Sequence, residues 1–205
     1  MDFASAPPSI VKSIRQRDLL NVWLRLYARE QRLPTIADFI PDRLADEVQD
    51  LVYYTVNNET VPARFRIESN GTRMASAYGA TGRGRDLEEY LGPIRRAPIM
   101  PAYYGCVDRM LPIFTISMVQ DVHGRPVVYE RLLMPFSSAP VGAGPAVVTD
   151  IIASLKTISE EGGFEIKNLM RGNETLPTPQ VSAVIDTQLF HRAFGPSPAD
   201  DIEIN

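Results

Sequence analysis

Apolar residues recur with helical spacing close to the N-terminus. Over residues 14–31 they stand three and four positions apart, which predicts an amphipathic helix with an unusually broad apolar face. The apolar stripe consists of Leu19, Leu20, Val22, Trp23, Leu24, Leu26 and Tyr27. Such a face either packs entirely on the core of its own domain or also holds a second copy of the chain, and the pattern leaves both interpretations open.

A different pattern follows, in which short β-branched and aromatic runs alternate with turn residues. The runs predict strands over residues 51–56, 63–69, 113–120, 127–137 and 147–158. The turns at Asn57-Asn58-Glu59 and His123-Gly124 join the first two strands and the next two into hairpins. Strands gathered into hairpins at either end, with short helices between them, predict an α+β domain with one antiparallel sheet and helices on one face.

The charge is unevenly distributed along the chain, although the net value is only -4. Residues 1–158 carry 18 Lys and Arg against 17 Asp and Glu, whereas residues 159–205 carry 3 against 8. We therefore expect an N-terminal extension (1–13), a folded domain (14–158) and an acidic, partly mobile tail (159–205), in which the apolar patch 181–190 docks on the body or on a partner.

Composition excludes several classes of function. There is no excess of positive charge, so a nucleic-acid partner is not expected. No apolar run is long enough for a membrane helix, and the N-terminus lacks a signal-peptide pattern, which favours a cytoplasmic protein without membrane contact. The single cysteine, Cys106, and the two histidines, His123 and His191, suggest neither a disulfide, nor a catalytic triad, nor a metal site.

Three glycines, Gly79, Gly82 and Gly84, lie among arginines in the segment 70–91 and raise the question of a phosphate-binding loop. Their spacing is GxxGxG, whereas the dinucleotide fingerprint is GxGxxG directly after a strand. The alternative is a connector of two short helices, in which Gly79 ends the first helix in the left-handed conformation. The spacing favours the connector.

The order of these segments resembles that of a PAS domain, and in particular of the short bacterial stand-alone PAS-like proteins. The resemblance runs from about Asp18 to Ile158 and is carried by DLLNVWLRLYAREQRLPTIADFIP, RFRIESNGTRMASAYGATGRGRDLEEYL, VVYERLLMPFSS and VVTDIIAS. It implies a five-stranded antiparallel sheet with helices on one face, preceded by the amphipathic helix, and often enclosing a pocket. The proline-rich segment 93–112 departs from the long regular helix of that family.

The resemblance also implies where a ligand and a partner would lie. We expect the pocket to be lined by Phe65, Ile67, Met74, Tyr78, Leu91, Phe114, Ile116 and Leu132. We expect a homodimer to form through the first helix, around Leu19, Trp23 and Leu26. The cysteine motif of flavin-binding members and the histidine of haem-binding members are absent, so the cofactor is unknown.

These observations lead to three hypotheses of function. The first is a non-enzymatic sensory or regulatory module of the PAS type, which binds a small molecule, dimerises, or signals to a separate output protein. The second is a ligand-free interaction or scaffold protein that uses the first helix and the acidic tail. The third is a small enzyme whose arginine cluster holds an anionic substrate.

Overall fold

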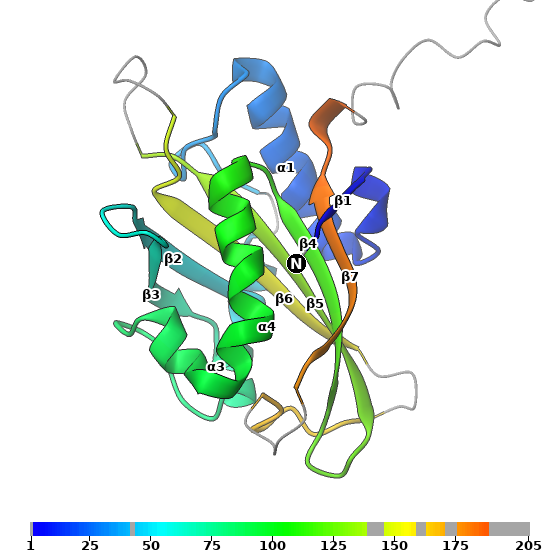
Figure 1. Cartoon of the computed structure of the whole chain (residues 1–205). Coiled ribbons are helices and arrows are strands. Elements are labelled where there is room, and N and C mark those ends of the chain that lie inside the picture. The colour runs from blue at the N-terminus through cyan, green and yellow to red at the C-terminus, as the bar shows by residue number, and fades with distance from the viewer. Residues whose placement is uncertain (1, 42–43, 139–145, 159–162, 171–175, 189–205) are drawn as a thin grey trace, which may run out of the picture.

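The computed structural model describes residues 2–41, 44–138, 146–158, 163–170 and 176–188. The helices are α1 (Ile14–Glu30), α2 (Leu44–Glu47), α3 (Thr72–Ala77) and α4 (Leu87–Arg109), with short 3-10 turns η1 (Pro8–Ile10) and η2 (Val48–Asp50). The strands are β1 (Ala4–Ala6), β2 (Leu51–Asn57), β3 (Arg64–Asn70), β4 (Ile113–Gln120), β5 (Pro126–Phe136), β6 (Asp150–Ile158) and β7 (Thr178–Ile185). They form a single sheet in the order β1-β7-β4-β5-β6-β2-β3 (Figure 1).

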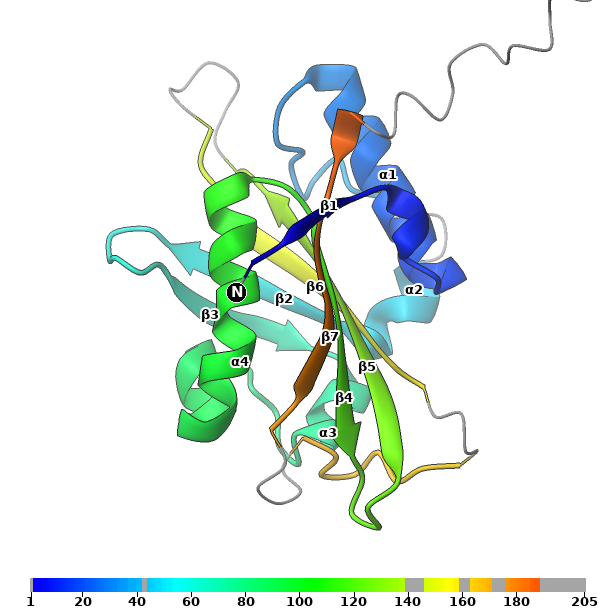
Figure 2. The same cartoon turned by 45° about the vertical axis from the view of Figure 1, so that its right-hand side comes forward.

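The prediction of a five-stranded antiparallel sheet with helices on one face is wrong. The described residues form a seven-stranded mixed sheet, because β7 pairs antiparallel with β4 and β1 pairs parallel with β7. Helices also cover both faces, with α4 on one side of the sheet and α1 on the other (Figure 2). The physical reason lies in the central strands, where consecutive residues 150–155 and 129–136 are all buried, and a sheet that is apolar on both faces must be covered on both.

The two added strands come from the ends of the chain. Ala4 pairs with Ala183 and Ala6 with Ile185, so the segments assigned to the N-terminal extension and to the tail meet at one edge of the sheet. Ala183 and Ile185 are buried. The expected domain boundary at residue 158 therefore falls inside the sheet, while the part of the expected mobile tail that covers 189–205 lies outside the described residues.

Helix α1 confirms the first helix that the periodicity predicts. The Ser13 hydroxyl accepts a hydrogen bond from the Gln16 N–H at its start, and the left-handed residue Gln31 ends it. Trp23 is completely buried, and its indole Nε1 donates to the Pro135 carbonyl of β5 over 2.7 Å. This bond fixes α1 on the face of the sheet away from α4.

Helix α4 is longer than its prolines suggest. Gly92, with φ of +73°, breaks the regular geometry, and Pro93 starts the long second part, which runs on through Pro98 and Pro101. Each internal proline removes one backbone hydrogen bond. Burial of an apolar face against the sheet offsets this loss, through Ile99, Met100, Ala102, Tyr103 and Cys106.

The glycine-spaced segment confirms the predicted connector. Helix α3 ends at Ala77, and Gly79 follows with φ of +69°. The chain then runs back along β3, where Gly84 N–H donates to the Ile67 carbonyl (2.7 Å) and Ile67 N–H donates to the Arg85 carbonyl (3.0 Å). The connector thus covers part of the outer edge of the sheet and brings α3 over the same face as α4.

Candidate functional site

A small cavity lies between the sheet and the layer formed by α3, the connector and α4. Its volume of about 10 Å³ corresponds to one water molecule. Its walls contain apolar residues from both layers together with a group of tyrosines and one asparagine. The lining residues are Val52, Tyr54, Ile67, Asn70, Met74, Tyr78, Leu87, Tyr90, Tyr103, Tyr129 and Leu155.

The structure places three of the expected pocket residues, Ile67, Met74 and Tyr78, in this lining. Phe65 and Leu91 are buried on the same side of the sheet but do not line the cavity. Phe114, Ile116 and Leu132 lie on the opposite face of the sheet, which α1 covers. Leu132 and Glu130 are two residues apart on β5 and share this face, and their cross-strand partners on β4 are Phe114 and Ile116. The eight expected residues therefore do not surround one common space.

Tyrosines form the polar part of the cavity wall. The Tyr54 and Tyr103 hydroxyls are 3.0 Å apart and share a hydrogen bond. Burial and the neighbouring Tyr103 raise the pKa of Tyr54 well above its ordinary value, and burial likewise raises the pKa of Tyr78. Burial raises the pKa of Tyr103 to about 12, although the charge of Arg131 pulls it in the opposite direction. All three phenols are protonated at neutral pH.

Arg131 is a buried charged side chain that contacts two of these tyrosines. It is 4% exposed, and its guanidinium lies 5.2 Å from the ring centre of Tyr129 and 5.8 Å from that of Tyr103. These cation–π contacts hold the side chain on the α4 side of the sheet. Burial alone lowers the pKa of Arg131, but the surrounding tyrosines, Tyr129 foremost, raise it more, so the guanidinium stays charged.

This buried cation has no anionic partner in the part of the chain that the structure describes. None of the ion pairs there involves Arg131, and its Nε–H donates no hydrogen bond. No described Asp or Glu lines the cavity either. An unpaired buried charge destabilises the folded state, so packing alone does not account for an arginine at this position.

Two polar groups in the cavity lining lack a hydrogen-bond partner among the described residues. The Tyr129 hydroxyl and the Asn70 Nδ2 are both buried and form no hydrogen bond with the described residues. The amide of Asn70 has a defined orientation, because its Oδ1 accepts from Gly82 N–H (3.3 Å) and from the Thr81 hydroxyl (2.9 Å). Its Nδ2 therefore remains a donor, like the Nε of Arg131.

The glycine connector itself has little capacity to bind a phosphate. Its backbone N–H groups are used internally: Gly82 donates to Asn70, Gly84 to Ile67 and Arg85 to Gly82. A phosphate cradle needs such groups free and convergent. The connector acts instead as one wall of the cavity.

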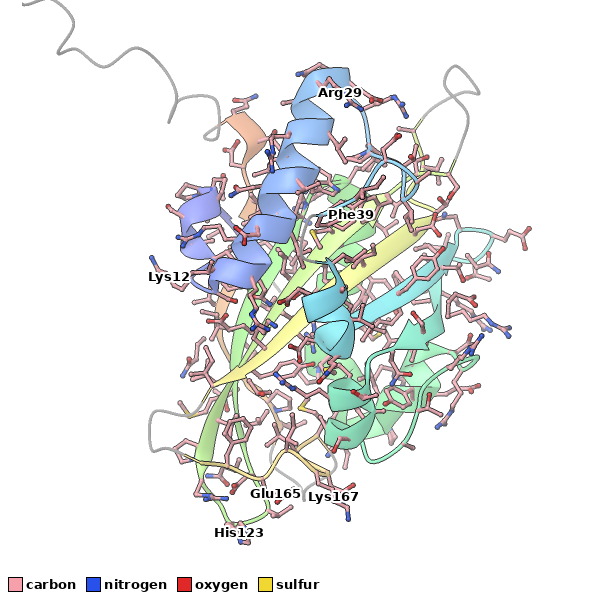
Figure 3. All side chains as sticks on the ribbon, turned by 180° about the vertical axis from the view of Figure 1, so that it is seen from behind. Lys12, Arg29, Phe39, His123, Glu165 and Lys167 are labelled. Carbon is pink, nitrogen blue, oxygen red and sulfur yellow. The ribbon has the colours of Figure 1, made fainter. Side chains whose placement is uncertain are left out.

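A second segment holds α3 from the outside. Asn168 N–H donates to the Ser76 carbonyl (2.9 Å) and Met170 N–H to the Ala77 carbonyl (2.8 Å). Further along, Glu165 N–H donates to Asp121 of the β4–β5 loop over 3.1 Å, and Figure 3 shows Glu165 beside His123 of that loop at one end of the molecule. The cavity roof is thus supported by residues 163–170.

A second polar cluster lies on the opposite face of the sheet, and it contains more acidic than basic groups. Lys156 Nζ contacts Glu47 and Asp50, each over 2.7 Å. The buried atoms without a hydrogen bond on this side are all oxygens: Gln16 Oε1, Glu47 Oε1, Asp50 Oδ1, Glu130 Oε2 and Ser154 Oγ. No group of three or more acidic, histidine or cysteine side chains among the described residues is arranged to hold a metal ion.

The expected dimer residues occupy two environments. Leu19 and Trp23 are buried in the core between α1 and the sheet. Leu26 is half-buried and lines a shallow groove of about 300 Å³ together with Val22, Arg25, Arg29 and Ile40. A larger groove of about 510 Å³ lies between the β2–β3 hairpin and the start of α4, lined by both acidic and basic residues.

Comparisons with family models, with curated proteins and with solved structures found no match to this chain. Among the described residues, no helix has the length and apolar character needed to cross a bilayer. Inference about function therefore depends on the site itself.

Sequence reasoning missed the polar residues Tyr129, Tyr103 and Asn70 of the cavity wall, and it missed the buried Arg131 that contacts the two tyrosine rings. One signal was present, because Arg131 stands inside the apolar run VVYERLLMPF of a predicted strand. A charge within a run that is otherwise buried is a candidate for function.

Proposed function

We propose that this protein is a non-enzymatic sensory or regulatory module that binds a small molecule in the tyrosine-lined cavity beneath α3 and α4. The observation that carries the proposal is a pair of buried polar groups in the cavity lining that form no hydrogen bond with the described residues, the Tyr129 hydroxyl and the Asn70 Nδ2. Buried donors are normally satisfied, and a bound molecule with acceptor groups would satisfy these.

The titratable groups around the cavity support a binding role over catalysis. The tyrosines have raised pKa values, with Tyr103 at about 12, and Arg131 keeps its proton. None of these groups is able to accept a proton at neutral pH, so they supply no general base. They are suited to hold a ligand through hydrogen bonds and ring contacts.

The cavity walls offer a way to convert binding into a signal. The cavity holds only about 10 Å³, so a molecule larger than one water needs additional space, which movement of α3 or the connector would provide. Movement of α3 would also act on residues 163–170, which are hydrogen-bonded to Ser76 and Ala77. A ligand that binds the displaced arrangement more tightly would shift the population toward it.

Native mass spectrometry of freshly purified protein tests this proposal. We expect a bound small molecule in the wild-type protein and in Tyr27→Phe, which removes a tyrosine hydroxyl from α1, on the other face of the sheet. We expect its loss or a clear decrease in its occupancy in Tyr129→Phe, which removes one of the two unpartnered polar groups of the cavity lining. A spectrum of ligand-free protein in all three samples, together with no binding from a library that includes neutral amphiphiles, contradicts the proposal.

An interaction role for α1 is a second candidate, because a shallow groove around Leu26 and Ile40 leaves apolar side chains at the surface. Ile40 is 78% exposed and Ile14 is 64% exposed, at opposite ends of this side of the molecule. We propose that α1 contributes a homodimer contact through Leu26. Both roles are compatible, since the cavity and this groove lie on opposite sides of the sheet.

A further inference from the structure

We infer that the segment 199–204 of this chain docks in the shallow groove on α1 of the same copy, and that it thereby limits the homodimer contact proposed for Leu26. The segment has the sequence ADDIEI and lies outside the described residues. Its docking is independent of a ligand in the cavity, whereas its effect on dimerisation rests on the proposed homodimer.

The groove presents apolar surface that the described body of the protein leaves uncovered. It has a volume of about 300 Å³ and is lined by Val22, Arg25, Leu26, Arg29 and Ile40. Ile40 is 78% exposed, and Val22 and Leu26 are only half-buried. Covering such side chains with another apolar group is favourable, so the groove is suited to an apolar occupant.

The wall that carries Ile40 is held in place by the core. The neighbouring Phe39 is buried and packs against Phe136, with 5.0 Å between the ring centres. Ser137 N–H donates to the Pro34 carbonyl over 3.0 Å and so ties the start of this loop to the end of β5. Figure 3 shows Phe39 and Arg29 toward the same end of the molecule. The groove is therefore formed in advance, which reduces the entropic cost of docking.

The polar side of the groove is basic. Arg25 and Arg29 line it together with the apolar residues, and the described lining contains no carboxylate. Arg29 and Arg32 share the carboxylate of Glu30, while Arg25 forms no ion pair with the described residues. Even with Asp38 close enough to act on Arg29, three guanidiniums face two carboxylates. This charge balance favours an acidic occupant.

The segment 199–204 combines both properties. Its acidic and apolar residues alternate from Asp201 onward. In an extended chain, Ile202 and Ile204 would project from one side, about 6.7 Å apart. Asp201 and Glu203 would project from the other side with the same spacing. An extended segment of this kind presents an apolar pair and an acidic pair at once.

Helix α1 offers a matching spacing. Val22 and Leu26 are four residues apart, as are Arg25 and Arg29. Four residues correspond to about 6 Å along a helix, and residues so spaced are neighbours on its surface. The apolar pair and the basic pair of α1 therefore repeat at nearly the same distance as the isoleucines and the carboxylates of the segment.

The length of the chain allows the segment to reach the groove of its own copy. The described chain ends at Gln188, after β7, and Figures 1 and 2 show this end of β7 at the same end of the molecule as the C-terminal part of α1. Residues 189–198 span up to about 35 Å when extended, whereas the whole of α1 is about 25 Å long. A tethered segment has a local concentration on the order of millimolar, which favours the same copy over a second one.

Docking would cover Leu26, the residue through which we propose that α1 contacts a second copy. The segment and the second copy then compete for one surface. The apparent affinity of the homodimer falls with the fraction of chains whose groove is open. The segment is thus an internal competitor of the dimer contact.

Cysteine cross-linking in the full chain tests the docking. Ile40→Cys is combined with Ile204→Cys, and Ile14→Cys with Ile204→Cys is the control, because Ile14 is an exposed isoleucine at the other end of α1. Cys106 is buried, and burial raises the pKa of its thiol, so it reacts slowly in both proteins. With oxidised glutathione, we expect an intrachain disulfide to form about tenfold or more faster at Ile40 than at Ile14. Intact mass and non-reducing electrophoresis measure it.

Charge reversal tests the recognition. Adding Glu203→Lys to the Ile40 pair should slow the cross-link several-fold, and adding Arg25→Glu to that protein should restore most of the rate, because opposite charges face each other again. Without the cysteines, Ile202→Ser with Ile204→Ser should free the groove and lower the Kd of the homodimer several-fold in analytical ultracentrifugation.

Several results would overturn the inference. Equal rates at Ile40 and Ile14, or a rate that Arg25→Glu does not restore, contradict docking in this groove. A product of dimer size whose yield rises with protein concentration places the segment on a second copy. An unchanged dimer Kd in the serine variant contradicts the competition. A wild-type protein that is monomeric at all concentrations but forms the intrachain cross-link rapidly supports the docking and contradicts the homodimer instead.

Discussion

Glu130 and Arg131 are consecutive residues of β5 whose side chains enter opposite faces of the sheet. Both are buried, with exposed fractions of 5% and 4%, and neither forms an ion pair in the part of the chain that the structure describes. Arg131 lies among tyrosines under α4, whereas Glu130 lies on the side of Lys156, its cross-strand neighbour. Buried charges without ion-pair partners destabilise the folded state, so each of these two residues is a candidate for a functional role.

Arg131→Met should therefore stabilise the ligand-free protein. Removal of an unpaired buried cation should contribute roughly 1–4 kcal/mol, from which the lost cation–π contacts with Tyr103 and Tyr129 subtract about 1–2 kcal/mol. Urea unfolding of wild type and variant measures the difference. A variant that is clearly less stable than wild type would show that Arg131 is a structural residue.

Glu130→Gln should also raise stability at neutral pH. Burial raises the pKa of Glu130, so folding disfavours its charged form above that pKa. The gain should be on the order of 1 kcal/mol, roughly 2–4 °C in Tm for a chain of this size. It should shrink as the pH falls through the raised pKa toward the ordinary value, because the wild-type carboxyl then becomes neutral. Tm values of both proteins across that pH range provide the measurement, and a gain that does not depend on pH would contradict the argument.

The local elements could be predicted from the sequence because their signals are local. The periodicity of α1 and the alternation of β3 and β4 depend on neighbouring residues, and the structure places these elements within one residue of the expected bounds at each end. The connector at Gly79 was predictable for the same reason. These features need no information about distant parts of the chain.

The sequence pattern did not predict which face of the sheet each residue of the central strands occupies. The expected pocket contained Leu132, which by the alternation of strand residues would place Arg131 on the face away from the pocket. In the structure, Arg131 lies on the face toward α4 and Leu132 on the face toward α1. The error arises because 129–136 is buried on both faces, so the pattern contains no marker of side. The two added strands were missed because β1 has only three residues and β7 contains Pro179. β1 becomes a strand by pairing with β7 over more than 170 positions, and β7 also pairs with the distant strand β4.

Asp121→Asn should lower stability in a pH-dependent manner. Burial by itself raises the pKa of Asp121, but hydrogen bonds from Arg125, Glu165 N–H and His123 N–H outweigh it and hold the pKa well below its ordinary value. A depressed pKa contributes stability that is present above the ordinary value of about 4 and is lost as the pH falls below it. Calorimetric Tm values should therefore differ between wild type and variant at pH 7 and converge in acid. Asp108→Asn, at an exposed position on α4, is the control and should have little effect at any pH.

Leu26→Glu should separate a dimer contact from a core contact on α1. Leu26 is half-buried in the shallow groove, so a charged side chain there is tolerated by the fold but disfavours a second apolar surface. We expect unchanged circular dichroism and a shift from dimer to monomer in light scattering. Ile94→Glu, on exposed α4 surface, should leave the mass unchanged, and Trp23→Glu should unfold the protein because Trp23 is fully buried. A wild-type protein that is already monomeric contradicts the proposed contact.

Gly82→Ala tests whether the connector determines the shape of the cavity wall. A Cβ atom at Gly82 would lie 2.7 Å from Ile67 Cδ1 and 3.1 Å from Tyr90 Cζ, and both side chains line the cavity. Since the backbone of Ile67 is fixed by two hydrogen bonds to the connector, the side chains must shift, and we expect a loss of about 1–3 kcal/mol in urea unfolding. We also expect weaker binding of any small molecule that native mass spectrometry finds in the wild type, because the displaced side chains of Ile67 and Tyr90 both line the cavity. Gly163→Ala is the matched control, since an added Cβ there meets no atom within 4 Å, and equal effects of the two substitutions would show that the connector does not shape the cavity.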